Sequence, residues 1–178
     1  LAVARALNDG RIRTAGKVIL VGDVGEEGPG NLRGVRHLLT GEYKSKVDFF
    51  ISVDGLGLHV TDRAVGSKRY SVRFTGPGGH SYGAFGMPSA IHAMGRAIAN
   101  ISDAQIPTGP KTTFNVGVVS GGTSVNSIAG DASMDVDMRS ESAESLDRIE
   151  DAIRRAIDAG VARENARWPN SPAKIAVR

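Results

Sequence analysis

The 178-residue sequence predicts an α/β protein in which part of a parallel or mixed sheet is followed by a ferredoxin-like βαββαβ unit. Two observations lead to this fold class. Short apolar runs bounded by glycine occupy the first part, which is typical of strands buried on both faces. From Ser67 onward the strands alternate between apolar and polar residues, which is typical of a sheet covered on one face. We therefore expect two domains, over residues 1–67 and 68–178.

The first domain is expected to contain two helices and two buried strands. Residues 1–7 form a helical segment that stops before Gly10. Lys17–Gly22 is a short apolar run and predicts a buried strand. Asn31 is placed to cap a following helix, and Val47–Val53 predicts a second buried strand. This order of elements favours a parallel sheet whose loops meet at the carboxyl ends of the strands.

The second domain is expected to contain four strands. Three of them alternate in polarity, and the last is short, over Ala173–Val177. The apolar positions expected to share the covered face of the sheet are Tyr70, Val72 and Phe74, then Phe114, Val116 and Val118, then Ala132, Met134, Val136 and Met138.

Two amphipathic helices are expected between these strands. The first starts near Pro88, and the second is capped by Ser142. Their apolar faces are expected to be Ile91, Met94, Ile98 and Ile101, and Leu146, Ile149, Ile153 and Ile157. The order β-α-β-β-α-β predicts a four-stranded antiparallel sheet with two helices on one face.

The composition excludes several classes of function. Apolar residues make up 40% of the chain and charged residues 23%, as in ordinary soluble proteins. The 22 Lys and Arg residues nearly balance the 19 Asp and Glu residues and form no run, so no nucleic-acid partner is expected. The chain has no cysteine. Disulfides and thiolate zinc sites are therefore excluded, and any metal must be held by His, Asp or Glu.

No apolar run approaches the ~20 residues that span a bilayer, so no membrane segment is expected. The start of the chain lacks the charged and apolar pattern of a signal peptide, and we expect a cytoplasmic protein. Leu1 lies inside a helical pattern without an initiator methionine. We therefore expect the chain to be a piece of a longer protein.

Carboxylates follow both predicted buried strands. Glu26 and Glu27 are adjacent in a glycine-rich loop, and Asp54 closes the second strand. One such carboxylate could bind a metal while its neighbour takes a proton from metal-bound water. The alternatives are a solvated acidic turn at Glu26–Glu27 and a turn-forming Asp-Gly pair at Asp54.

Three polar residues of the second domain are further candidates. His80 lies in a glycine-rich turn and could polarise a carbonyl, or it could be an ordinary loop histidine. Asn126 lies in a glycine-rich loop that could bind a ligand or simply connect two strands. Arg139 could grip a carboxylate with its guanidinium group, or it could pair with acids such as Asp135 or Asp137.

Five segments in a fixed order carry a resemblance to a known family. They are VGEEGPGNLRG, VDG, GPGGHS, SGGTSVN and DVDMRS. On these segments, the chain resembles the dinuclear-zinc metallopeptidase family that includes glutamate carboxypeptidase, acetylornithine deacetylase, succinyl-diaminopimelate desuccinylase, aminoacylase and tripeptide aminopeptidase. The match extends over essentially the whole chain. It implies part of a zinc-exopeptidase catalytic domain, followed by a ferredoxin-like lid that dimerises through a helix and an edge strand.

The resemblance also implies a role for each candidate residue. Glu26 corresponds to the general base that activates a zinc-bridging water. Glu27 corresponds to a ligand of one zinc ion and Asp54 to a ligand of the other. His80 corresponds to the lid histidine that reaches the partner subunit's active site and stabilises the oxyanion of the tetrahedral intermediate. The residues that correspond to the substrate-binding positions are Asn126 and Arg139, the latter as a clamp for a free carboxylate.

The resemblance thus implies a homodimeric hydrolase with two zinc ions that cleaves an amide bond of a small peptide or an N-acyl amino acid. The family's His-x-Asp motif, its bridging Asp and its final zinc-binding His are missing from this sequence. We therefore expect the 178-residue piece to be inactive alone and to bind no zinc stably. The alternative is a non-catalytic dimerisation or ligand-binding module, and a regulatory domain for small molecules is a weaker third possibility.

Overall fold

The computed structural model describes residues 1–27, 30–55, 57, 60–106 and 108–178. Gly28 and Pro29, which belong to the glycine-rich segment after Glu27, lie outside the described residues. The chain divides into two compact units, Leu1–Leu58 and His59–Arg178.

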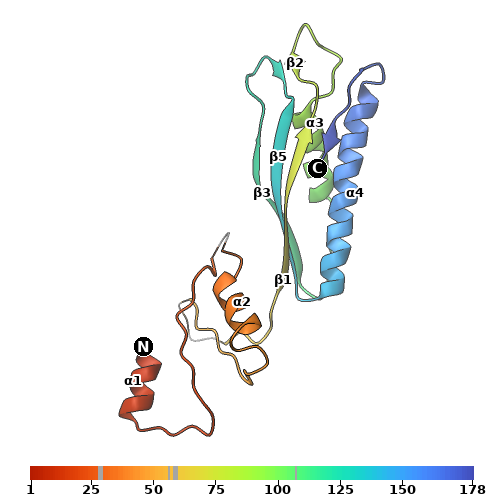
Figure 1. Ribbon diagram of the computed structural model, residues 1–178. Helices are drawn as coiled ribbons and strands as arrows, with labels where there is room; N and C mark the ends of the chain where they lie inside the picture. The colour runs from red at the N-terminus through yellow and green to blue at the C-terminus, as the bar shows by residue number, and fades with distance from the viewer. Residues whose placement is uncertain (28–29, 56, 58–59, 107) are drawn as a thin grey trace. The chain divides into compact units, whose positions relative to one another are not determined.

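The first unit contains two short helices, α1 over Ala2–Asp9 and α2 over Arg33–Thr40 (Figure 1). Helix α1 confirms the predicted first helix. The expected cap of the second helix is wrong, because Leu32 occupies the N-cap position and Asn31 precedes it. Both residues have left-handed backbone conformations, with φ values of 53° at Asn31 and 55° at Leu32. An N-cap side chain bonds the first turn from an extended backbone conformation, which Asn31 does not have.

The two buried strands predicted for the first unit are wrong. Among the described residues of Lys17–Gly22 and Val47–Val53, none is in a strand, and all are exposed. Phe49 is 92% exposed and Val53 is 90% exposed. An apolar run forms a buried strand only where neighbouring strands bond its backbone and other elements cover its faces. The described residues of Leu1–Leu58 provide no such neighbours.

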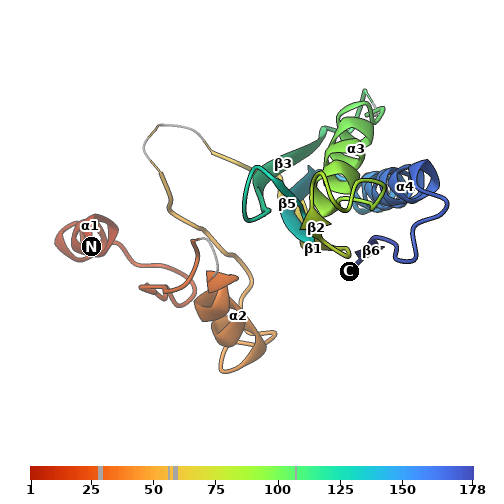
Figure 2. The ribbon, with the colours of Figure 1, turned by 90° about the horizontal axis from the view of Figure 1, so that it is seen from above.

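The second unit has the predicted βαββαβ order and a four-stranded antiparallel sheet, in the order β3-β5-β1-β6. Helices α3 and α4 lie on one face of this sheet (Figures 1 and 2). The ferredoxin-like fold class is confirmed. The main elements are β1 over Gly66–Thr75, α3 over Ala90–Ser102, β3 over Thr112–Gly121, β5 over Asp131–Ser140, α4 over Ala143–Arg167 and β6 over Ala176–Val177.

The core of this unit lies between the sheet and the two helices. The predicted inward face of β5 is confirmed, since all four of its apolar residues are at most 2% exposed: Ala132, Met134, Val136 and Met138. The predicted cap of α4 is also confirmed, because Oγ of Ser142 accepts a hydrogen bond from the backbone N–H of Ser145 at 3.3 Å. Alternation along strands and capping at a helix start are local properties, which explains why the sequence predicts them well.

Strand β3 contains a bulge that changes the expected face of one residue. Val116 pairs with Val136, but Val118 pairs with Asp135, so Gly117 is an extra residue in the register. A bulge of this kind moves the next side chain to the other face of the sheet. Val118 therefore lies on the face without helices and is 58% exposed, which corrects its predicted place beside Phe114 and Val116.

A second, two-stranded sheet joins the loops at one end of the unit. Strand β2 over Gly79–His80 pairs antiparallel with β4 over Ser127–Ile128 (Figure 1). Strands of two residues are too short to show a hydrophobic period, and the sequence therefore does not predict them. This pairing brings together two loops that are far apart in the chain.

Candidate functional site

The β2–β4 pair places two of the predicted site residues side by side. His80 pairs with Ser127, the residue after Asn126. The backbone N–H of Ser81 donates a hydrogen bond to the carbonyl oxygen of Asn126 at 2.9 Å. Both predicted side chains are exposed. The structure therefore gathers His80 and Asn126 at one end of the second unit.

The imidazole of His80 is oriented by its own turn. Its Nδ1 accepts hydrogen bonds from the backbone N–H groups of Tyr82 and Gly83, both at 3.3 Å. A ring nitrogen that accepts hydrogen bonds carries no proton, so the neutral ring carries its proton on Nε2. In this form the exposed side chain offers a hydrogen-bond donor, which is the group needed to stabilise a developing oxyanion.

The loop that carries Asn126 is held by a local bond. Oγ of Ser124 donates to Oδ1 of Asn126 at 2.6 Å, and the backbone N–H of Ser127 donates to the carbonyl oxygen of Ser124 at 3.1 Å. The first bond uses the amide oxygen of Asn126. The amide nitrogen of Asn126 carries N–H donors that this bond does not use.

The turn after His80 is supported by an aromatic contact that the sequence analysis missed. The rings of Phe85 and Trp168 meet edge to face, with centroids 5.4 Å apart. Phe85 is 77% exposed, so the contact covers only part of its ring. Trp168 follows the end of α4 and is far from Phe85 in sequence, so no local pattern connects the two.

Arg139 lies on the face of the sheet without helices, in a group of charged side chains with Arg69 and Asp137. Its Nε donates to Asp137 at 2.8 Å, and Nε of Arg69 donates to the same carboxylate at 2.8 Å. Partial burial raises the pKa of Asp137, but the hydrogen bonds from Arg69 and Arg139 outweigh it and hold that pKa below its ordinary value. Of the two alternatives for Arg139, the structure contains the pairing with Asp137. A substrate carboxylate would have to compete with Asp137 for this arginine.

The three predicted catalytic-domain carboxylates do not form a metal site in the structure. Glu26, Glu27 and Asp54 are all exposed. Within the part of the chain that the structure describes, no three His, Asp or Glu side chains come together in a way that could hold a metal ion. A catalytic zinc normally has three protein ligands. The residues present therefore do not fit a zinc site on their own.

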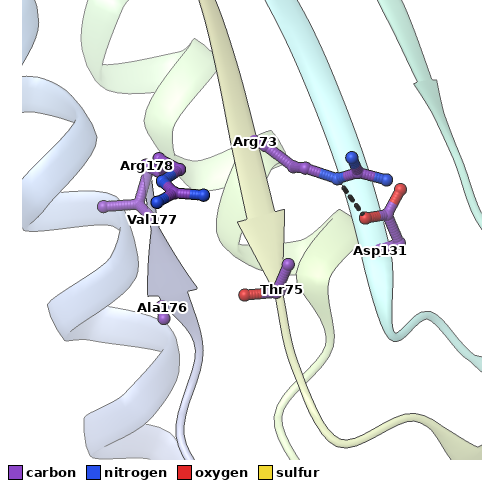
Figure 3. A pocket seen from close by; sticks show the side chains of 6 residues that line it. All are labelled: Arg73, Thr75, Asp131, Ala176, Val177 and Arg178. Atoms are coloured by element: carbon purple, nitrogen blue, oxygen red, sulfur yellow. Dashed lines mark hydrogen bonds and ion pairs between the residues drawn. The ribbon is translucent and has the colours of Figure 1, made fainter.

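A shallow hollow lies on the sheet around the end of β6 (Figure 3). An ion pair crosses from β1 to β5 at its wall, where Nε of Arg73 donates to Asp131 at 2.7 Å. None of the predicted site residues is among the six that line it: Arg73, Thr75, Asp131, Ala176, Val177 and Arg178. The hollow is separate from the residues that the resemblance assigns to catalysis.

No helix within the described ranges is both long enough and apolar enough to span a bilayer.

Comparison with known proteins finds one matching family model. The model describes a peptidase dimerisation domain, and it matches residues 64–165. The matched residues include β1, α3, β3, β5 and most of α4. No curated protein matches the sequence.

Three solved structures share the fold. An aminobenzoyl-glutamate utilization protein from Klebsiella pneumoniae has a TM-score of 0.56 and 20% identity, over 69% of this chain and 32% of that one. A hydantoinase/carbamoylase family amidase from Burkholderia ambifaria has a TM-score of 0.54 and 22% identity, over 65% of this chain and 27% of that one. A tripeptidase from Staphylococcus aureus has a TM-score of 0.50 and 19% identity, over 64% of this chain and 29% of that one. The chain thus spans at most about a third of each structure.

Proposed function

The chain belongs to the family of peptidase dimerisation domains, and from this premise we propose that it is part of a homodimeric hydrolase that cleaves amide bonds. The match over residues 64–165 carries the proposal, because it spans most of the second unit. The structures of similar fold are named as a tripeptidase, an amidase and an aminobenzoyl-glutamate utilization protein, and these names agree with amide chemistry. The substrates proposed here are small peptides or N-acyl amino acids.

The second unit supplies residues that act on the substrate. His80 donates a hydrogen bond from Nε2 to the oxyanion that forms when the amide carbonyl is attacked, and it does so in the partner subunit's site. Asn126 binds the substrate beside it. Arg139 binds the free carboxylate of the substrate in place of its present partner, Asp137. The proximity of His80 and Asn126 across the β2–β4 pair supports this division of roles.

The first unit supplies the base of the proposed reaction. Glu26 takes a proton from the attacking water and passes it to the leaving nitrogen. Glu27 and Asp54 are proposed metal ligands, as the resemblance implies. The complete enzyme would need further ligands from outside this chain to bind two zinc ions, since the described residues bring no such set together.

The test uses the full-length protein, with and without the substitution Glu26→Gln. The unchanged protein is expected to hydrolyse members of a panel of dipeptides, tripeptides and N-acyl amino acids, and to contain about two zinc ions per chain. Glutamine has nearly the size of glutamate but cannot take up the proton. Activity should therefore fall by roughly 10²–10⁴-fold while the zinc content stays the same.

Glu42→Gln is the matched control, because Glu42 is an exposed glutamate of the same unit without an assigned role. It is expected to leave both activity and zinc content unchanged. Activity that survives Glu26→Gln would remove Glu26 as the base. A full-length protein without zinc and without turnover would instead support the non-catalytic dimerisation or binding module.

A further inference from the structure

Glu164 is a buried carboxylate that no part of the proposed reaction uses. It lies in α4 and is 0% exposed. Its Oε1 accepts hydrogen bonds from the backbone N–H of Ser89 at 3.2 Å and from Nε1 of Trp168 at 3.3 Å. Its Oε2 accepts from Nε of Arg96 at 3.0 Å. Burial raises the pKa of Glu164, but these bonds outweigh it and lower the pKa overall, which keeps the side chain charged.

Two of these partners connect Glu164 to the segment of residues 80–89, which begins at His80. Ser89 ends this segment, at the N-cap position of α3. Phe85 lies in the middle of the segment, and its ring packs against that of Trp168 with centroids 5.4 Å apart. A single carboxylate oxygen therefore binds both the end of the segment and the ring that supports its middle.

The other end of the segment holds the imidazole itself. His80 is paired with β4, and its Nδ1 accepts hydrogen bonds from the backbone of Tyr82 and Gly83. The orientation of the ring thus depends on where the backbone of the turn lies. A displacement of the backbone at Tyr82 and Gly83 changes the hydrogen bonds that orient the imidazole.

We propose that Glu164 is a positioning residue for His80, acting through Ser89 and Trp168 on the segment between His80 and α3. The inference rests on the proposed function, since it requires His80 to act in hydrolysis. A displacement of about 1 Å in a group that contacts the reacting atoms can lower a rate by roughly 10²-fold. A carboxylate that binds Ser89 directly and supports Phe85 through Trp168 limits such displacements.

The first experiment uses the fluorescence of Trp168, which is the single tryptophan of the 178-residue chain. Phe85→Ala removes the ring contact, and Glu164→Gln replaces the charged partner of the indole N–H. Both are expected to shift the emission of Trp168 and to increase its quenching by acrylamide. Ile106→Ala is the matched control at another exposed apolar residue, and it is expected to change neither. Emission and quenching that stay unchanged in both variants would overturn the proposed connection.

The second experiment is a double-mutant cycle in the full-length enzyme. His80→Ala is expected to lower kcat by roughly 10²-fold. Phe85→Ala and Glu164→Gln are each expected to lower kcat by about 10-fold with little change in KM, because a misplaced donor weakens the transition state more than substrate binding. Neither change should lower kcat further in the His80→Ala background.

Each outcome of the cycle decides between the claims. If Phe85→Ala or Glu164→Gln lowers kcat further in the His80→Ala background, Glu164 acts on stability or on another part of the enzyme. The inference would then be wrong, while the proposed function stands. A kcat that His80→Ala leaves unchanged would remove the role of His80 and the inference with it. Because Phe85 is exposed, Phe85→Ala tests the link from Trp168 to the turn after His80 even if Glu164→Gln fails to fold.

Discussion

Glu150 is the centre of a charged cluster that fastens α4 to β1. It forms an ion pair with Lys68, its Oε1 accepts a hydrogen bond from the hydroxyl of Tyr70 at 2.5 Å, and it pairs with Arg154 at 2.8 Å. The hydrogen bond from Lys68, followed by those from Tyr70 and Arg154, lowers the pKa of Glu150 from 4.5 to about 2. Its side chain is 13% exposed, so solvent screens these bonds less than it screens a surface pair.

This pKa determines how Glu150 contributes to stability as the pH changes. A carboxylate whose pKa is lower in the folded state stabilises the fold fully above its unfolded pKa. The contribution then decreases below pH 4.5 and is lost as the pH falls through about 2. We expect Glu150→Gln to reduce the free energy of unfolding by roughly 1–2 kcal/mol at pH 7. The difference from the unchanged chain should vanish near pH 2, as measured by urea unfolding of both chains across this range.

Glu144→Gln is the control for this measurement. Glu144 pairs with Arg148 on the same helix, but the two side chains are 75% and 69% exposed. An exposed pair of this kind contributes about 0.3–0.5 kcal/mol. A loss at pH 7 that is no larger for Glu150→Gln than for Glu144→Gln would contradict the role given to the cluster.

At the scale of the elements, α3 and α4 approach closely where Gly160 faces Ala97. A Cβ atom added at Gly160 would lie 2.5 Å from the backbone nitrogen of Ala97 and 2.8 Å from its Cα. Backbone atoms cannot move aside as the end of a side chain can. Glycine at this position is therefore required by the close contact of the two helices.

We expect Gly160→Ala to destabilise the second unit although alanine is the better helix former. The gain in helix propensity is about 1 kcal/mol, and the cost of overpacking is roughly 1–3 kcal/mol. Gly95→Ala in α3 is the matched control, since a Cβ atom there meets nothing within 4 Å. Thermal unfolding should show a lower Tm for Gly160→Ala and an equal or higher Tm for Gly95→Ala. An increase in Tm for both variants would show that the helices can separate without loss.

The buried stripe of α4 contains a sequence signal for Glu164. Ile153, Ile157, Gly160 and Glu164 follow one another at spacings of 4, 3 and 4 residues and are all buried. The helical period therefore already places Glu164 on the inward face. A charged residue at such a position is a signal for a buried partner, and Arg96 from α3 is that partner.

At the scale of the whole molecule, β3 is the structural feature that suits the proposed dimer. It is an edge strand of 10 residues and pairs with β5 on one side. An edge strand presents N–H and C=O groups that a second copy can bond. Val118 and Val119 on this strand are 58% and 56% exposed and point to opposite faces of the sheet.

We expect lysine at both of these positions to weaken self-association. Charged side chains on both faces of an edge strand oppose the approach of a second edge. The double variant Val118→Lys and Val119→Lys should raise the dimer Kd at least about tenfold, which corresponds to roughly 1.4 kcal/mol. Sedimentation equilibrium would measure it. Val125→Lys is the control, because Val125 is fully exposed and lies outside β3. An equal Kd for the edge variant and the control would place the interface elsewhere.

The sequence alone determined the architecture of the second unit. Alternating polarity predicted the inward face of β5, and the spacing of apolar residues predicted the buried face of α4. Predictions from these two patterns are confirmed because each pattern depends only on residues that are close in the chain. The same reasoning failed for Lys17–Gly22 and Val47–Val53, because a buried strand also needs partners that a local apolar run does not reveal.

Tertiary structure alone decided how the candidate residues are arranged. The sequence identified His80 and Asn126 separately, and the β2–β4 pair brought them together. The support that Glu164 and Trp168 give to the turn after His80 likewise joins residues far apart in the chain. Such contacts carry no periodic signal, because the folded backbone and not the spacing of residues sets their geometry.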